Sequence, residues 1–450
     1  MTATTGFSEN RRQVVHIAMG GFALLLRFLV WWEAAALAAA ALAFNLYALP
    51  RIAGPHIFRS GEHAHRYSSG IMLYPLSVLF LICALPDRPD IVAAAWGILA
   101  AGDGMATIAG RRLGGRTIPW NREKSVAGSL AFIACGASAG VFLCWWCTPV
   151  VIPPPYPWFP IAAPIVAAIA AAAVETVPIR MDDNISVAAT AAAVLWWISL
   201  VSEDAATSAA VAALGALPVA MVVNSVVAAA GYYARTVTPA GAVSGAMLGT
   251  AVMLAAGWGG WVLLFAAFAS AVITSRLGLR RKTLLGIAEP QGGRRGAGNA
   301  IANTGVATAA AILAATSDAT GPAMIAFVAA LASGGSDTIA SEIGKAWGRR
   351  TLLFPSLRLV PPVTSGAVSL EGTAAGLLGA LGLGALGAAL GLVPAAALLP
   401  NVAGATVGSF AESAMGATLE GPGFVNNDVL NFLNTAIAAA TAVFLARVLA

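Results

Sequence analysis

The sequence predicts an all-α, polytopic integral membrane protein with roughly 13 to 15 transmembrane helices in two related modules. Of the 450 residues, 59% are hydrophobic and only 10% are charged, and the mean hydropathy of +0.81 is far above that of an ordinary soluble chain. Apolar runs long enough to span a bilayer recur along the whole sequence. No hydrophilic stretch is long enough to form a separate soluble domain, so any chemistry must be built from helix ends and short loops.

The apolar runs begin close to the start of the sequence. Six come first, in the order VVHIAMGGFALLLRFLVWW, AAALAAAALAFNLYAL, GIMLYPLSVLFLICAL, PDIVAAAWGILAAG, VAGSLAFIACGASAGVFLCWW and WFPIAAPIVAAIAAAAVE. Arg11 and Arg12 precede the first run and predict a cytoplasmic start. The first residues resemble neither a cleavable signal nor a transit peptide, so we expect a prokaryotic cell membrane with the active sites on its cytoplasmic side.

The basic residues are concentrated in loops between the apolar runs. Of the 25 Lys and Arg, five fall in 111–124, six in 276–295 and four in 345–358. These loops are expected to share the cytoplasmic face. Positive-inside topology therefore explains the net charge of +5, and no nucleic-acid partner is expected.

The acidic residues are the main functional candidates. An ionised carboxylate at membrane depth is costly unless it is paired, bound to a metal or placed in a wet cavity. Ten acids lie in or at the ends of apolar segments: Asp103, Glu175, Asp182, Asp183, Asp337, Glu342, Glu371, Glu412, Glu420 and Asp428. For Asp182, Asp183 and Glu420, a role as a helix cap or a position in headgroup water is an equally good interpretation.

An internal repeat relates the two halves of the chain. GDGMATIAGRRLGGRT at 102–117 aligns without gaps to the segment ending GSDTIASEIGKAWGRRT at 351 when Asp103 is placed on Asp337, with six identities in fifteen positions. Later in each half, Glu175 precedes MDDN and Glu412 precedes NND, and a small-residue turn lies between the two elements. The pattern predicts two related modules, 1–202 and 203–450, that meet at the polar stretch SEDAATS.

The repeated residues suit phosphoryl transfer. Carboxylates followed by Asp or Asn form a ligand set typical of Mg²⁺, and Arg or Lys can neutralise phosphate oxygens. The glycines at four-residue spacing allow a polyphosphate to approach the backbone, although the spacing alone favours helix packing. The sequence contains neither the GxxxxGK[ST] string of a P-loop nor a GxGxxG string after a strand.

These motifs resemble two known families in tandem. Residues 1–202 resemble the phytol and dolichol kinase family on NRRQVVHIAMG, GIMLYPLSVLF, GDGMATIAGRRLGGRTIPWNREKSVAGSLAF and VETVPIRMDDNISV. That family phosphorylates long-chain isoprenoid alcohols with CTP. Residues 203–450 resemble the phytyl-phosphate kinase family on TPAGAVSGAMLGT, KTLLGIAEPQGGRRG, IANTG, SDTIASEIG, TSGAVSLEGT, ESAMGATLE and NNDVLNFLN. One departure is Glu412, where that family leads us to expect Asp.

The resemblance implies two consecutive reactions on a membrane lipid. The first module would convert phytol or a related prenyl alcohol to its monophosphate, and the second would convert the monophosphate to the diphosphate. CTP as co-substrate and Mg²⁺ as cofactor are part of this expectation. Two other functions stay open: cytidylyl transfer to a lipid phosphate, which would use similar residues, and transport by a protein with internal repeats.

For the first module, Asp103, Glu175 and Asp183 are the expected catalytic and metal-binding residues. The expected nucleotide- and phosphate-binding residues are Gly110, Arg111, Gly114, Arg116, Lys124, Gly128 and Ser129. For the second module, the catalytic candidates are Asp337, Glu342 and Glu412, with Asp337 and Glu412 as metal ligands. The phosphate-binding candidates there are Gly344, Lys345, Arg350, Ser365, Gly366, Asn426, Asn427, Asn431 and, as extra positive charge for an anionic substrate, Lys282, Arg294 and Arg295.

Overall fold

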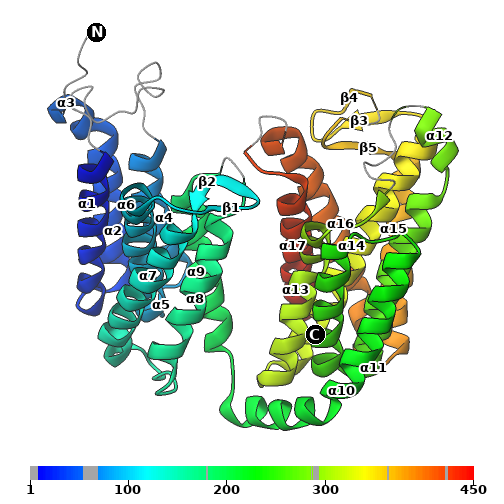
Figure 1. Cartoon of the computed structure of the whole chain (residues 1–450), viewed down its shortest axis with the longest axis horizontal. Helices are drawn as coiled ribbons and strands as arrows, with labels where there is room; N and C mark the ends of the chain where they lie inside the picture. Colours follow the sequence, from blue (N-terminus) through cyan, green and yellow to red (C-terminus); the bar gives the residue numbers. More distant parts are fainter. Residues whose placement is uncertain are drawn as a thin grey trace. The chain divides into compact units, whose positions relative to one another are not determined.

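The computed structural model describes residues 9–53, 69–178, 181–284, 286, 293–361, 364–420 and 424–449. The chain divides into two compact units, Met1–Ser199 and Leu200–Ala450. Both units are almost entirely helical (Figure 1). Part of the KTLLGIAEPQGGRRG motif lies outside the described residues.

The first unit is built around one central helical stretch. Its elements are α1 Glu9–Met19, η1 Gly20–Arg27, α2 Trp31–Ala43, η2 Phe44–Ala48, α3 Leu49–Ala53, α4 Ser69–Ala84, α5 Pro89–Gly97, η4 Ile98–Asp103, α6 Gly104–Leu113, β1 Thr117–Ile118, β2 Asn121–Ser125, α7 Val126–Cys147, η5 Thr148–Val150, α8 Phe159–Glu175 and α9 Asp183–Ser199. The stretch Pro89–Leu113, formed by α5, η4 and α6, is largely buried and packs against α7. Because Asp103 lies within this stretch, its carboxylate is held at the centre of the unit.

Small side chains explain how the helices of the first unit approach closely. α8 buries Ala163, Ala167 and Ala171, which are four residues apart and therefore lie on one face of the helix. α8 packs against both α7 and α9. Alanine faces of this kind bring backbones together in membrane proteins, where packing rather than water exclusion drives helix association.

The second unit is centred on α14. Its elements are α10 Glu203–Tyr233, α11 Pro239–Arg276, α12 Leu279–Leu284, α13 Ala297–Thr316, α14 Thr320–Trp347, β3 Thr351–Leu353, β4 Arg358–Leu359, β5 Ala367–Ser369, α15 Leu370–Ala389, η7 Ala395–Ala397, α16 Leu398–Met415, η8 Gly416–Glu420 and α17 Asn427–Leu449. α14 contacts α11, α13, α15, α16 and α17 and is largely buried. It carries Asp337, so both aspartates of the repeat lie on the central helix of their unit.

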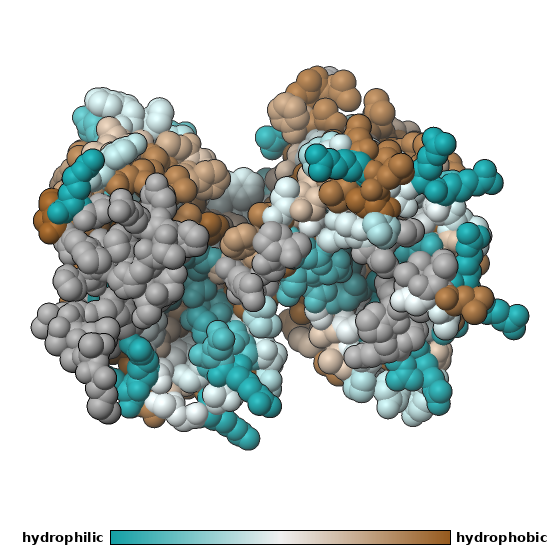
Figure 2. All heavy atoms as spheres, turned by 90° about the horizontal axis from the view of Figure 1, so that it is seen from above, coloured by the Kyte–Doolittle hydropathy of each residue, from teal (hydrophilic) through white to brown (hydrophobic). Residues whose placement is uncertain are grey.

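Short antiparallel strands follow the central helix in each unit. In the first unit β1 pairs with β2, and in the second the strand order is β4-β3-β5. In the second unit the three strands and α12 lie at the same end of the helices (Figure 1), so the described parts of the basic loops 276–295 and 345–358 share that end. Figure 2 looks down on this end and shows hydrophilic residues gathered there.

The repeated segment folds in the same way in both units. Ser125 caps α7 by accepting a hydrogen bond from the Gly128 amide at 3.1 Å, and Ser369 caps α15 in the same way through Gly372, also at 3.1 Å. A Cβ built on Gly128 would lie 3.0 Å from the carbonyl oxygen of Ala106, and one on Gly372 would lie 2.6 Å from that of Ala340. In each unit this glycine therefore allows the central helix and the next helix to cross closely.

In the described part of the chain, fewer helices are long and apolar enough to span a membrane than the sequence predicts. Among the described residues, eight helices are long and apolar enough to cross a membrane, against the expected 13 to 15. Several apolar runs form shorter helices; α8, with 17 residues, is about 26 Å long, below the bilayer core of about 30 Å. Conversely, α11 has 38 residues, and Gly257, at φ +64°, divides it into two helical segments.

Candidate functional site

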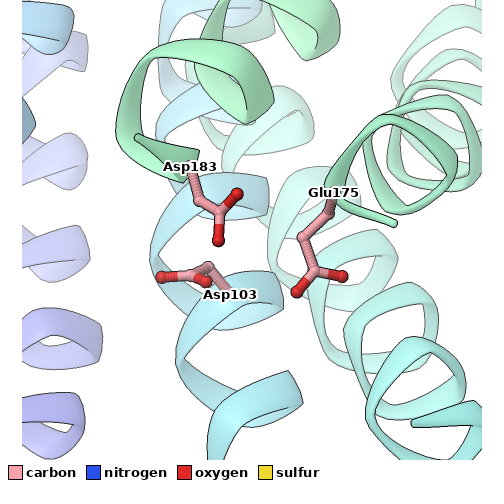
Figure 3. Close-up of side chains that lie close together, drawn as sticks. All are labelled: Asp103, Glu175 and Asp183. Carbon is pink, nitrogen blue, oxygen red and sulfur yellow. The ribbon is translucent and has the colours of Figure 1, made fainter. Parts of the chain in front are cut away.

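Three carboxylates meet in the first unit. Asp103 ends η4, Glu175 ends α8 and Asp183 begins α9. One carboxylate oxygen from each lies within 4.8 Å of the other two, and the side chains point toward one another (Figure 3). Among the described residues, this is the one such group of three or more acidic, His or Cys side chains. The structure thus brings together the three residues that the sequence predicts as metal ligands.

Lys124 lies beside two of these carboxylates. Its Nζ donates to Oε1 of Glu175 at 2.5 Å and to Oδ2 of Asp183 at 3.0 Å. Burial by itself lowers the pKa of Lys124, but the charges of Asp183 and Glu175 outweigh it, so the pKa is raised above the ordinary lysine value. The side chain of Lys124 is therefore a positively charged ammonium group at neutral pH.

The hairpin β1–β2 determines where Lys124 lies. Trp120 Nε1 donates to the hydroxyl of Thr176 at 3.1 Å, and Asn121 Nδ2 donates to the Thr176 carbonyl oxygen at 3.1 Å. Both bonds tie the hairpin to the residue directly after Glu175. As a result, Lys124 and Glu175 are positioned by the same contact between the hairpin and the end of α8.

The other predicted phosphate ligands of the first unit divide into two groups. Arg111 and Arg116 are exposed and form no ion pair within the described part of the chain, and Gly114, at φ +59°, has open space around it. By contrast, Gly110 and Gly128 face Ser125 in the crossing of α6 with α7. A side chain at either position would meet Ser125 or the neighbouring helix, so helix packing is one reason for these two glycines. Their role in phosphate binding stays a prediction.

Two further side chains lie near these groups in the first unit. Ser129, another predicted phosphate ligand, has a buried hydroxyl without a hydrogen-bond partner in the described residues. The sequence interpretation missed His16, whose Nε2 lies 3.6 Å from Oδ2 of Asp103 and 3.4 Å from the carbonyl oxygen of Leu99. The sequence did contain a sign of this residue, because His16 is a polar side chain within an otherwise apolar run.

The second unit contains a polar cavity of about 630 Å³. Two predicted acids line it, Asp337 from α14 and Glu412 from α16. The other predicted residues that line the cavity are Arg295, Gly344, Lys345, Ser365, Gly366, Asn427 and Asn431. Gly344 also packs against Ser369, as Gly110 packs against Ser125. The cavity is thus lined by charges of both signs.

An acid pair lies in the wall of this cavity. Asp337 and Glu412 both line the cavity, and their carboxyl groups are close enough to interact with each other. Asn434 donates to Oε2 of Glu412 at 2.6 Å and accepts from Ser333 at 2.6 Å. The sequence interpretation missed Asn434, although Asn427, Asn431 and Asn434 have the spacing of one helical face.

Several predicted residues of the second unit do not line the cavity. Glu342 is 1% exposed and pairs with the ammonium groups of Lys282 and Lys345, and Lys282 also donates to the carbonyl oxygen of Ser275 at 2.7 Å. Glu342 and Asp337 are five residues apart, about 140° around one helix, so their side chains leave α14 in different directions. Neither Glu342 nor Lys282 lines the polar cavity, although Lys345, which pairs with Glu342, does. A role of Glu342 and Lys282 in the site stays a prediction.

Three other predicted residues also lie apart from the cavity lining. Arg350 is exposed, Arg294 is partly buried, and neither lines the cavity. Asn426 accepts a hydrogen bond from the Val429 amide at 3.0 Å, so its side chain caps α17. Within the described residues, Asp337 and Glu412 have no third acid near enough to form a group like that of the first unit.

Comparisons with known proteins identify relatives for parts of the chain. The description "Integral membrane protein DUF92" matches residues 222–439. An uncharacterized membrane protein of Synechocystis is 37% identical over 216 residues, which cover 46% of this chain and 82% of that protein.

Relatives with kinase names match shorter stretches. A probable phytol kinase of Glycine max is 40% identical over 91 residues, covering 20% of this chain and 28% of that protein. A farnesol kinase of Arabidopsis thaliana is 34% identical over 130 residues, covering 27% and 40%. The chain thus spans less than half the length of either kinase, and no solved structure matches it. Through the match to residues 222–439 and the Synechocystis relative, the chain belongs to the DUF92 family of integral membrane proteins.

Proposed function

We propose that the chain is a membrane isoprenoid kinase with two sites. The first unit transfers a phosphoryl group to phytol or a related prenyl alcohol, and the second transfers another to the resulting monophosphate. The observation that carries the proposal is the carboxylate cluster of Asp103, Glu175 and Asp183 in a chain whose relatives include a probable phytol kinase and a farnesol kinase. CTP is the proposed donor on the sequence resemblance alone.

The carboxylate cluster fits a magnesium ion. Carboxylate oxygens are hard ligands that suit Mg²⁺. The three carboxylates lie within 4.8 Å of one another, and when ionised they carry more negative charge than the single positive charge of Lys124 can balance. Asp103, Glu175 and Asp183 would hold the ion, which would offset charge on the donor phosphates when bound.

In the first reaction the prenyl hydroxyl oxygen attacks the terminal phosphorus of the donor. A new O–P bond forms, the bond to the bridging oxygen of the donor breaks, and the nucleoside diphosphate leaves with that electron pair. The hydroxyl proton passes to a carboxylate of the cluster or to water. Lys124, Arg111 and Arg116 bind the phosphates, because their positive charges lie next to the cluster or on the exposed end of α6 and the loop after it.

In the second reaction the attacking oxygen belongs to a phosphate monoester and is already anionic. No hydroxyl proton has to be removed, but two anionic groups must be brought together. Lys345 and Arg295 supply positive charge at the wall of the polar cavity. Asp337 and Glu412 are the metal-binding candidates there, and Asn434 orients Glu412.

The basic loops indicate which end of the second unit faces which side of the membrane. We assign the end of the second unit with α12 and β3–β5 to the side of the membrane that carries the nucleotide, since basic loops favour the positive side. The proposal places the protein in a prokaryotic cell membrane with this side cytoplasmic.

The test separates the two reactions. Asp103→Asn and Asp337→Asn are assayed in membranes with Mg²⁺ and CTP, on a prenyl alcohol and on a prenyl monophosphate. The first variant is expected to lose only alcohol phosphorylation and the second only diphosphate formation. Glu123→Gln on the exposed face of β2 and Asp318→Asn on an exposed loop are matched controls that keep both activities. If both site variants keep both activities, the assignment is wrong.

The same assay distinguishes the alternative functions. Products resolved by mass show either an added phosphate or an added cytidylyl group, and the second outcome would establish a cytidylyltransferase. Movement of substrate across proteoliposomes without nucleotide consumption would establish a transporter. A panel of prenyl alcohols with four nucleotides identifies both the preferred chain and the preferred donor.

A further inference from the structure

A second cavity of the second unit is almost entirely apolar. It has a volume of about 150 Å³ and lies among α10, α11, α13 and α14. The apolar side chains in its wall include Val227, Leu248, Leu264, Phe265, Phe268 and Leu331. A cavity of this lining suits a hydrocarbon chain and has little to offer a nucleotide.

The apolar cavity adjoins the polar cavity that contains the acid pair. Arg295, Asn299 and Thr338 line both cavities. Arg295 Nη1 donates to Asn299 Oδ1 at 2.8 Å, which holds the guanidinium group at this junction. One molecule with an anionic head and an apolar tail can therefore place its head in the polar cavity and its tail in the apolar one.

A hydrogen-bonded pair, Trp261 and Asn224, lines the apolar cavity away from Arg295. Trp261 Nε1 donates to Oδ1 of Asn224 at 3.0 Å, and Asn224, which is 4% exposed, donates to the Ala220 carbonyl oxygen at 2.9 Å. Trp261 is stacked on Phe265 with ring centroids 5.4 Å apart. These fixed side chains form a rigid wall.

The helix α11 gives the depth of the cavity. Gly241 packs against the Arg295 carbonyl oxygen at the junction, and Gly249 packs against Asn224. The eight residues between these two levels correspond to about 12 Å along the helix. Gly245 lies midway, lines the cavity, and has open space where a Cβ would be.

We infer that this apolar cavity binds the part of the prenyl chain next to the phosphate during the second reaction. Arg295 and Asn299 bind the phosphate at the junction, and the Trp261–Asn224 pair limits how far the chain enters. The inference rests on the proposed second reaction for the identity of the ligand. It adds a binding site for the prenyl chain of the substrate. It also assigns the choice among prenyl chains of different length to residues of α10 and α11, away from the phosphate.

The experiment fills the cavity without touching the acid pair. Gly245→Leu is compared with Gly215→Leu on α10, a position that is also exposed with open space but does not line the cavity. Phosphorylation of phytyl, farnesyl and dimethylallyl monophosphates is measured for both variants. Gly245→Leu is expected to lower kcat/KM for the two long chains by about tenfold, the effect of losing the burial of two CH₂ groups. The short substrate, the prenyl alcohol reaction of the first unit and all activities of Gly215→Leu should stay unchanged.

A binding measurement tests the tail site independently of whether the protein forms diphosphate. A photoreactive prenyl monophosphate is cross-linked to the full chain, and the labelled peptides are mapped. Labels on α10 and α11 that disappear in Gly245→Leu would support the tail site. If the same protein forms no diphosphate, that absence would overturn only the proposed reaction. Turnover with an unchanged preference among the three chains, or labels confined to other helices, would overturn the tail site.

Discussion

Replacing Lys124 by Met is the sharpest test of the carboxylate cluster. The change removes a charge that lies 2.5 Å from Glu175 and 3.0 Å from Asp183, while keeping much of the side-chain volume. Glu175 has a side chain only 4% exposed, so water replaces little of the lost interaction. The variant is left with clustered carboxylates of like charge and no ammonium beside them.

The structure sets the size of the effect. Removing one partner of a fully buried ion pair costs about 3–5 kcal/mol. Because the Lys124 side chain is 27% exposed, we expect the lower end, about 3 kcal/mol. For a unit of this size that free energy corresponds to a fall in Tm of about 6–12 °C.

The assay is thermal unfolding of the full chain in detergent, with Mg²⁺ or with EDTA. If the cluster binds a divalent ion, Mg²⁺ should restore part of the stability lost by Lys124→Met, because the ion replaces the missing positive charge. Arg122→Met in the same hairpin is exposed and should change Tm little. An equal loss with and without Mg²⁺ would refute metal binding by the cluster, and no loss at all would refute the electrostatic argument.

The pH dependence of this pair has a defined sign. The folded protein holds the Lys124 proton more tightly than the unfolded chain, since its pKa is raised. The contribution of Lys124 to stability is therefore fully present below the ordinary lysine pKa of about 10.4 and is lost as the pH rises through the higher folded value. The difference in Tm between wild type and Lys124→Met should be constant at neutral pH and shrink only in strong alkali.

Three further variants probe the packing around the two sites. Glu342→Gln leaves Lys282 buried without its carboxylate and should destabilise the protein by about 3–5 kcal/mol, yet the folded fraction should keep its diphosphate-forming activity; thermal unfolding and activity per folded molecule check this. Gly128→Val forces α6 away from α7 and should reduce alcohol phosphorylation by about a hundredfold, while supplied monophosphate is still converted. Asn434→Leu removes the donor to Glu412 and should lower kcat for diphosphate formation by about tenfold, with alcohol phosphorylation as the internal control.

The residues of the first site could be predicted from sequence because they are rare there. A carboxylate in or beside an apolar segment stands out against the composition. Asp103 follows an apolar run within the helical stretch Pro89–Leu113, and Glu175 and Asp183 lie at helix ends. The all-α class follows from the same composition, because only helices satisfy backbone groups over long apolar runs. Glu342 lies in the same apolar segment as Asp337, but its position around the helix directs it to Lys282, a partner that the sequence alone does not show.

The sequence by itself determined the class of the protein, the repeat and the candidate acids, since these depend on residue type and spacing along the chain. Only the tertiary structure decided which of them meet. Lys124 pairs with Glu175 because the hairpin is tied to Thr176, 55 residues beyond Asn121, and Asn434 reaches Glu412 because α16 and α17 pack together. Contacts between segments this far apart depend on how whole helices pack, which local spacing does not encode.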